Sequence, residues 1–188
     1  MRAKLAFLLL AAALIAADGE GLRAGVFDPP RAAPDFSLRG SDGARLELRR
    51  FRGKVVILQF GFSSCPKVCP TTLVSLAEAR RKLGEDGEAL QVVYVTVDPE
   101  RDDVERLRKY LGGFDATFVG GTGTEEQLEA VRRDYGIVAA RIRSDPDYSF
   151  SHSSYTYLID REGMLRALMP YGQPSDDYVH DVKVLLEQ

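Results

Sequence analysis

An apolar run that ends in two cysteines constrains this chain more than any other feature. The stretch VVILQFGFSSCPKVCPTTL runs from Val55 to Leu73 and holds the only two cysteines of the sequence, Cys65 and Cys69. Residues 55–60 are mostly β-branched or large and carry no charge, which favours a central strand buried on both faces of a sheet. The sequence therefore predicts that the cysteines follow directly after a rigid strand.

The cysteines also stand at the start of a predicted helix. A glycine and two serines break the apolar pattern, and Pro70 suits the first turn of a helix that we expect over residues 71–82. Cys69 then lies at the helix start, with Cys65 just before it. Free backbone N–H groups and the positive end of the helix dipole favour a thiolate there, which is the form that attacks disulfides and binds soft metals.

The first residues predict export from the cytoplasm. Basic residues at positions 2 and 4 precede an apolar run that ends at Ala17, and the acidic Asp18 follows, as in a secretory signal. The apolar run of about 13 residues is shorter than the roughly 20 that a spanning helix needs. We therefore favour a cleaved signal over residues 1–17 to an uncleaved membrane anchor.

The rest of the chain fits one domain. Residues 18–33 contain glycine and proline without a period and predict a linker, and the pattern changes at Pro34, which gives a single domain over residues 34–188. Loss of residues 1–17 would remove two basic and no acidic residues, and would move the formal net charge from −3 to −5. This acidic balance gives no support for nucleic-acid binding.

Alternating strand and helix patterns predict an α/β fold. We expect a hairpin over residues 35–48, helices over 71–82, 102–111, 124–135 and 175–187, and strands over 55–60, 90–97, 117–119, 155–160 and 164–169. The helix over 124–135 would open with a capping pair, Thr124 and Gln127. A polar loop over residues 145–154 would hold His152. A mainly parallel sheet with a cysteine pair after an early strand matches a thioredoxin-like fold: a central mixed sheet flanked by helices, plus an N-terminal hairpin and additional hairpin and helix insertions.

Three blocks, taken in order, resemble a known family. They are FRGKVVILQFGFSSCPKVCPTTL (51–73), VTVDPERDDVERLRKYL (95–111) and SHSSYTYLIDREG (151–163). Over residues 34–188 the chain is similar to the Sco/SenC family of copper-binding, cytochrome c oxidase assembly proteins. The three blocks together are specific, whereas the CxxxC spacing alone would be weak.

The resemblance implies a copper site. By position, the family's ligands fall on Cys65, Cys69 and His152. Two thiolates suit Cu(I), and an added imidazole makes a site that can also hold Cu(II). Asp98, in the VDPERD segment, matches a position that is commonly acidic in the family. Two interpretations of Asp98 stay open. It lies near the copper loop and contacts the ligands rather than the ion, or it is a cap or turn residue before Pro99.

Two residues depart from the family pattern without removing a ligand. Lys67 stands where an acidic residue is usual between the cysteines, and its positive charge is expected to lower the pKa values of the thiols. Ser151 stands where an aspartate commonly precedes the histidine. This change is expected to weaken an interaction that orients His152.

The resemblance further implies a copper chaperone rather than an enzyme. It would act in the periplasm or another extracytoplasmic space and deliver copper to the binuclear centre of cytochrome c oxidase subunit II. Because an oxidised CxxxC supplies no thiolates, a thioredoxin-like reductant is an expected partner. A second expected partner is another copper chaperone.

Three other functions remain to be weighed. In a thiol-disulfide oxidoreductase, Cys65 and Cys69 would be a redox-active pair, although the chain lacks the CxxC spacing and the proline of thioredoxin-type enzymes. In a peroxidase of the same fold, a threonine would stand where this chain has Phe62. An inert structural disulfide would contribute only about 2 kcal/mol, because the loop that it closes is short.

Overall fold

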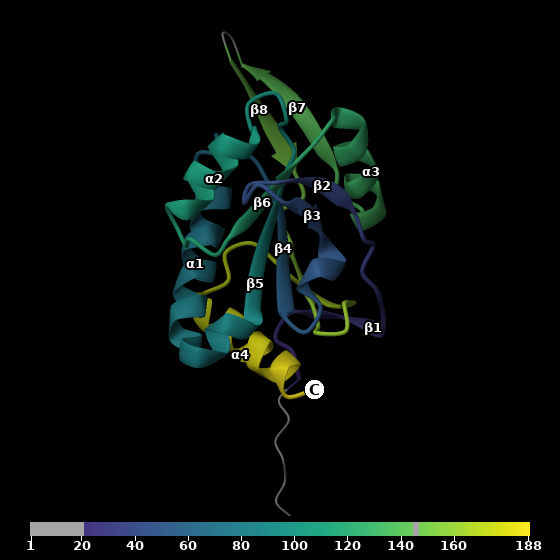
Figure 1. Ribbon diagram of the computed structural model, residues 1–188, viewed down its shortest axis with the longest axis vertical. Coiled ribbons are helices and arrows are strands. Elements are labelled where there is room, and N and C mark those ends of the chain that lie inside the picture. The colour runs from purple at the N-terminus through teal and green to yellow at the C-terminus, as the bar shows by residue number, and fades with distance from the viewer. Residues whose placement is uncertain (1–20, 145–146) are drawn as a thin grey trace, which may run out of the picture.

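The chain folds around an eight-stranded mixed sheet (Figure 1). A computed structural model describes residues 21–144 and 147–188, so the predicted signal over residues 1–17 lies outside the described part. The elements are β1 (Gly25–Ala32), β2 (Ser37–Gly40), β3 (Arg45–Glu47), η1 (Leu48–Phe51), β4 (Val55–Gly61), α1 (Val68–Leu83), η2 (Gly84–Ala89), β5 (Leu90–Thr96), α2 (Val104–Gly112), β6 (Val119–Thr122), α3 (Glu125–Tyr135), β7 (Ala139–Ser144), β8 (Asp147–His152), β9 (Thr156–Ile159), β10 (Met164–Met169) and α4 (Ser175–Leu186). The order in the sheet is β1-β10-β9-β4-β5-β6-β2-β3, and β7 and β8 form a separate hairpin.

Strands β4 and β5 form the centre of the sheet. They pair in parallel, with Val55 opposite Leu90, and every residue of both strands is buried. Because side chains alternate along a strand, Val55 and Ile57 enter one hydrophobic cluster while Val56 and Leu58 enter the other. The prediction of a strand buried on both faces is confirmed.

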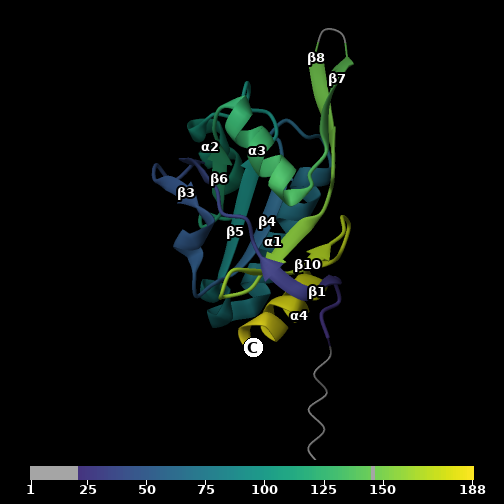
Figure 2. The same cartoon turned by 90° about the vertical axis from the view of Figure 1, so that its right-hand side faces the viewer.

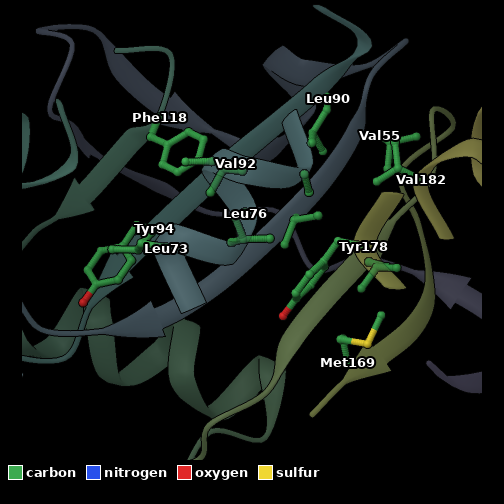
Figure 3. Close-up of a cluster of buried hydrophobic side chains, with 14 of the residues drawn as sticks. Val55, Leu73, Leu76, Leu90, Val92, Tyr94, Phe118, Met169, Tyr178 and Val182 are labelled. Atoms are coloured by element: carbon green, nitrogen blue, oxygen red, sulfur yellow. The ribbon is translucent and has the colours of Figure 1, made fainter. Parts of the chain in front are cut away.

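Helices cover both faces of the sheet. Helices α1, α2 and α4 supply side chains to one cluster, which Figure 3 shows in part, and α3 and η1 supply side chains to the other. Helix α1 begins at Val68, three residues before the predicted start, and keeps Pro70 in its first turn. The predicted capping pair at the start of α3 is also present, because Thr124 and Gln127 exchange side-chain and backbone hydrogen bonds.

The N-terminal linker differs from the prediction. Residues 25–32 form the edge strand β1, which pairs antiparallel with β10. Two prolines and a shift of register between Val26 and Arg31 remove the alternating pattern that would have revealed a strand. The folded domain therefore begins before Pro34.

The loop expected over residues 145–154 is also wrong. Residues 147–152 are strand β8, which pairs with β7 from Ala139 opposite His152 onward. The hairpin projects beyond the main sheet (Figure 2), so its side chains do not alternate between a core and solvent. Without that alternation, its polar sequence indicated a loop.

Within the described ranges, no helix has both the length and the apolar character needed to cross a bilayer.

A buried carboxylate attaches the N-terminal segment to α4. Asp181 is fully buried and accepts hydrogen bonds from the backbone N–H groups of Arg23, at 2.7 Å, and Ala24, at 3.0 Å. We expect Asp181→Asn to lower the free energy of unfolding by about 2 kcal/mol, because one amide oxygen cannot replace two carboxylate oxygens. Urea denaturation measures this change. The matched control Asp176→Asn removes only an exposed ion pair with Lys82 and should lower the free energy of unfolding much less. Equal losses in the two variants would contradict the prediction.

Candidate metal centre

The site lies at the edge where the two central parallel strands end. Strand β4 ends at Gly61 and strand β5 at Thr96, and the Val97 N–H donates to the Gly61 carbonyl at 2.7 Å. The cysteine loop follows β4, and the VDPERD segment follows β5. Loops after adjacent parallel strands meet at one edge, which is the usual place for a site in an α/β sheet.

Asp102 fixes the start of the cysteine loop. Its carboxylate is fully buried and accepts hydrogen bonds from the Ser63 N–H at 2.9 Å, the Thr96 hydroxyl at 2.7 Å and the Ser63 hydroxyl. Arg106 adds a hydrogen bond to the Ser63 hydroxyl at 2.7 Å. The sequence analysis missed Asp102, and the available signal was the last acidic residue of VDPERD.

The two cysteines occupy different environments. Cys69 lies in the first turn of α1 and is fully buried, whereas Cys65 is partly exposed. Both are free thiols, and the Cys69 N–H points to the Cys65 sulfur at 3.5 Å. The predicted position of the pair at a helix start is confirmed.

The pair is electrostatically asymmetric. The Cys69 thiol lowers the pKa of Cys65 to about 5, with further help from the backbone N–H groups of residues 67–69 against the opposing effect of burial. The same interaction and burial raise the pKa of Cys69. The pair therefore holds one proton at neutral pH, with the negative charge on Cys65. Lys67 contributes through its backbone N–H, which is a different cause from the side-chain charge that we expected.

His152 approaches the buried cysteine from the end of β8. Its Nε2 lies 3.9 Å from the Cys69 sulfur, and its Nδ1 lies 2.8 Å from the Ser153 carbonyl oxygen. A carbonyl oxygen only accepts, so Nδ1 carries a proton, and in the tautomer protonated only there the lone pair of Nε2 faces the sulfur. The backbone of Ser153 thus orients the ring, whereas the family pattern pointed to the side chain at position 151 for such a contact.

The three predicted ligands are close together but are not yet arranged around one point. Among the described residues, no group of three or more His, Cys, Asp or Glu side chains is placed to hold a metal ion. Capture of an ion by Cys65, Cys69 and His152 would therefore require a local adjustment.

Asp98 supports the hairpin rather than the cysteine loop. Its buried carboxylate accepts a hydrogen bond from the Tyr148 hydroxyl at 2.9 Å and also binds the Arg101 guanidinium. Arg101 lies 3.9 Å from the centre of the Tyr148 ring and donates to the Tyr148 carbonyl at 3.0 Å. The backbone of Asp98 also forms the turn, because its carbonyl accepts from the Asp102 N–H at 2.9 Å.

Comparison with known proteins identifies the family. The SCO1/SenC family model matches residues 27–187. The chain belongs to the SCO1/SenC family. An SCO2-like protein of Rickettsia conorii is 35% identical over 139 residues, which cover 72% of this chain and 68% of that protein.

Solved Sco structures share the fold. The crystal structure of Arabidopsis thaliana ScoI with copper bound is 32% identical, with a TM-score of 0.77 over 84% of this chain and 99% of that one. The solution structure of apo Sco1 from Thermus thermophilus is 34% identical, with a TM-score of 0.79 over 88% and 97% of the two chains. The predicted thioredoxin-like fold of this SCO1/SenC protein is confirmed.

The charge asymmetry predicts selective alkylation of the reduced SCO1/SenC protein. Because Cys65 has a pKa of about 5, its thiolate persists above pH 5, and its rate of reaction with iodoacetamide should fall only below that pH. Mass spectrometry after limited reaction should find the label on Cys65 and not on the buried Cys69. Cys69→Ala removes the main cause of the low pKa and should move the rate profile to higher pH. A wild-type profile centred near the ordinary thiol value would contradict the prediction.

The Asp98 contact predicts that Tyr148 restrains the hairpin. Tyr148→Phe removes the hydroxyl that donates to the buried carboxylate, a hydrogen bond to a charged group worth about 1.5 kcal/mol. Amide hydrogen exchange in β8 should therefore become about tenfold faster. Tyr155→Phe is the matched control, because Tyr155 is exposed beside the same site. Unchanged exchange in the Tyr148 variant would show that the contact does not restrain β8.

Proposed function

We propose that this protein binds copper through Cys65, Cys69 and His152 and delivers it to the binuclear copper centre of cytochrome c oxidase subunit II. The observation that carries the proposal is the approach of the His152 Nε2 lone pair to within 3.9 Å of the Cys69 sulfur, beside the Cys65 thiolate. The Arabidopsis relative was crystallised with copper bound. Soft sulfur donors with one imidazole are the ligand set expected for copper.

The arrangement suits an ion that is carried and then released. Cys69 is buried, but Cys65 and His152 are partly exposed, so an acceptor could replace these two ligands one at a time. The two thiolates would hold Cu(I), and His152 would complete a site for Cu(II). Because His152 lies on a projecting hairpin, its withdrawal would not disturb the main sheet.

We place this activity outside the cytoplasm. Residues 1–17 resemble a secretory signal, and an oxidising compartment would close the CxxxC pair into a disulfide that cannot bind copper. A thioredoxin-like reductant is therefore a required partner in the proposal. Another copper chaperone would serve as the donor of the ion.

The alternative function is reduction of the cysteines of the copper acceptor. The low pKa of the partly exposed Cys65 favours it, because a thiolate is the species that attacks a disulfide. Cys65 would attack the acceptor disulfide and form a mixed disulfide while releasing one acceptor thiolate. Cys69 would then displace the second acceptor sulfur, which leaves the acceptor reduced and the Cys65–Cys69 pair oxidised.

Copper titration of the reduced protein tests the ligands. We expect one ion per chain, loss of tight binding in Cys65→Ser and Cys69→Ser, and a His152→Ala variant that loses more affinity for Cu(II) than for Cu(I). The matched control is His180→Ala, since His180 lies on α4 and is the only other histidine of the sequence. Full Cu(II) affinity and an unchanged sulfur-to-copper absorption band in His152→Ala would refute the histidine as a ligand.

Mixing experiments separate delivery from reduction. The copper-loaded protein is added to a reduced, metal-free subunit II domain, and the metal-free dithiol is added to the oxidised domain. Appearance of the binuclear-centre absorption in the first mixture supports delivery. Thiols gained by the acceptor only in the second mixture, without copper transfer in the first, would favour the alternative.

A further inference from the structure

A buried tyrosine hydroxyl lies beside the buried cysteine without a partner. Tyr94, in the middle of β5, is fully buried, and its hydroxyl has no hydrogen-bond partner among the described residues. Figure 3 shows the hydroxyl directed away from the aliphatic side chains of the cluster. An unpaired buried hydroxyl destabilises the folded state, so phenylalanine would be the more stable choice for packing alone.

Gly61 brings this hydroxyl close to the cysteine. A Cβ atom at Gly61 would lie 2.4 Å from the Tyr94 hydroxyl oxygen and 2.6 Å from the Cys69 sulfur. Two atoms at these distances from one point are at most 5 Å apart. Both therefore occupy the space that a side chain at position 61 would fill, at the end of the strand that leads to the cysteine loop.

The Cys69 sulfur needs donors when it loses its proton. Metal binding removes the proton of the Cys69 thiol and leaves a negative sulfur in an apolar cluster. The Tyr94 hydroxyl, at most 5 Å from this sulfur, lies where it can supply a donor. Tyr94 is free to donate, because no other described group accepts from it.

We propose that Tyr94 donates a hydrogen bond to the Cys69 thiolate in the metal-bound protein and so helps to set the affinity of the site. The inference rests on the proposed function for its use with copper. Tyr94 does not touch the ion in this proposal and acts as a positioning residue through the sulfur. Its role is that of the groups that hydrogen-bond to metal ligands from outside the coordination sphere.

Tyr94→Phe tests the proposal with Cu(I) and Cd²⁺ as probes, measured by competition with chelators without oxygen. We expect both affinities to fall about tenfold, the effect typical of losing one hydrogen bond to a ligand. In the Cu(II) form, the sulfur-to-copper band should move to lower energy, because the sulfur loses a stabilising donor. The metal-free variant should be at least as stable to urea as the wild type, since the substitution removes an unpaired buried hydroxyl.

Tyr110→Phe is the matched control. The Tyr110 hydroxyl is also buried without a partner among the described residues, and its ring packs against Tyr94 at 6.1 Å, but it is not among the atoms over Gly61. Tyr110→Phe should change the Cu(I) and Cd²⁺ affinities by less than about twofold. Wild-type affinities and an unmoved band in Tyr94→Phe would overturn the inference, as would a loss of metal-free stability that matches the loss of affinity.

The two probes separate this inference from the proposed function. Cd²⁺ also binds as a soft ion to thiolates, so it tests the Tyr94 hydrogen bond without copper. A wild-type protein that binds Cd²⁺ but not copper would end the copper proposal, while a weaker Cd²⁺ complex in Tyr94→Phe would still support the hydrogen bond. Copper binding that is identical in the wild type and Tyr94→Phe would support the copper proposal and refute the Tyr94 hydrogen bond.

Discussion

The buried carboxylates of Asp98 and Asp102 hold the two halves of the candidate metal centre together. Asp102 binds the backbone at Ser63 and so fixes the cysteine loop, and Asp98 binds Tyr148 and so fixes the hairpin that carries His152. Both carboxylates come from one turn after β5, closed by a hydrogen bond between their backbones. Burial of a carboxylate is unfavourable unless its oxygens are paired, so each contact is strongly specified.

This arrangement gives the candidate ligands unequal freedom. Cys69 is part of α1, which packs on the central sheet, whereas His152 lies at the end of a hairpin outside that sheet. The distance between the Cys69 sulfur and the His152 ring is therefore set by the hydrogen bonds of the turn and by the packing of the hairpin on Phe62. Such a division suits a centre that keeps its sulfur donors fixed and adds or releases a nitrogen donor.

Local patterns predicted the parts of the fold whose signals lie in adjacent residues. The strand before the cysteines, the helix after them and the capping pair at Thr124 and Gln127 follow from burial, proline placement and hydrogen bonding within a few residues. Strand β1 and the β7–β8 hairpin gave no alternating signal, because one is a proline-containing edge and the other projects from the sheet. The contact between Asp102 and Ser63 joins residues 39 positions apart, and no local pattern encodes such a pairing.

The asymmetry of the cysteines bears on how the pair can work. The partly exposed Cys65 is already a thiolate near neutral pH, but a thiol of such low pKa is a weaker nucleophile than one that titrates near the working pH. The buried Cys69 has a raised pKa, so it would resolve a mixed disulfide slowly unless its proton were removed. A copper ion held by the pair, as proposed, would remove that obstacle directly, because its positive charge would stabilise both sulfurs as thiolates. The same environment that slows disulfide chemistry is thus compatible with metal binding, which favours the carrier function over the reductase function.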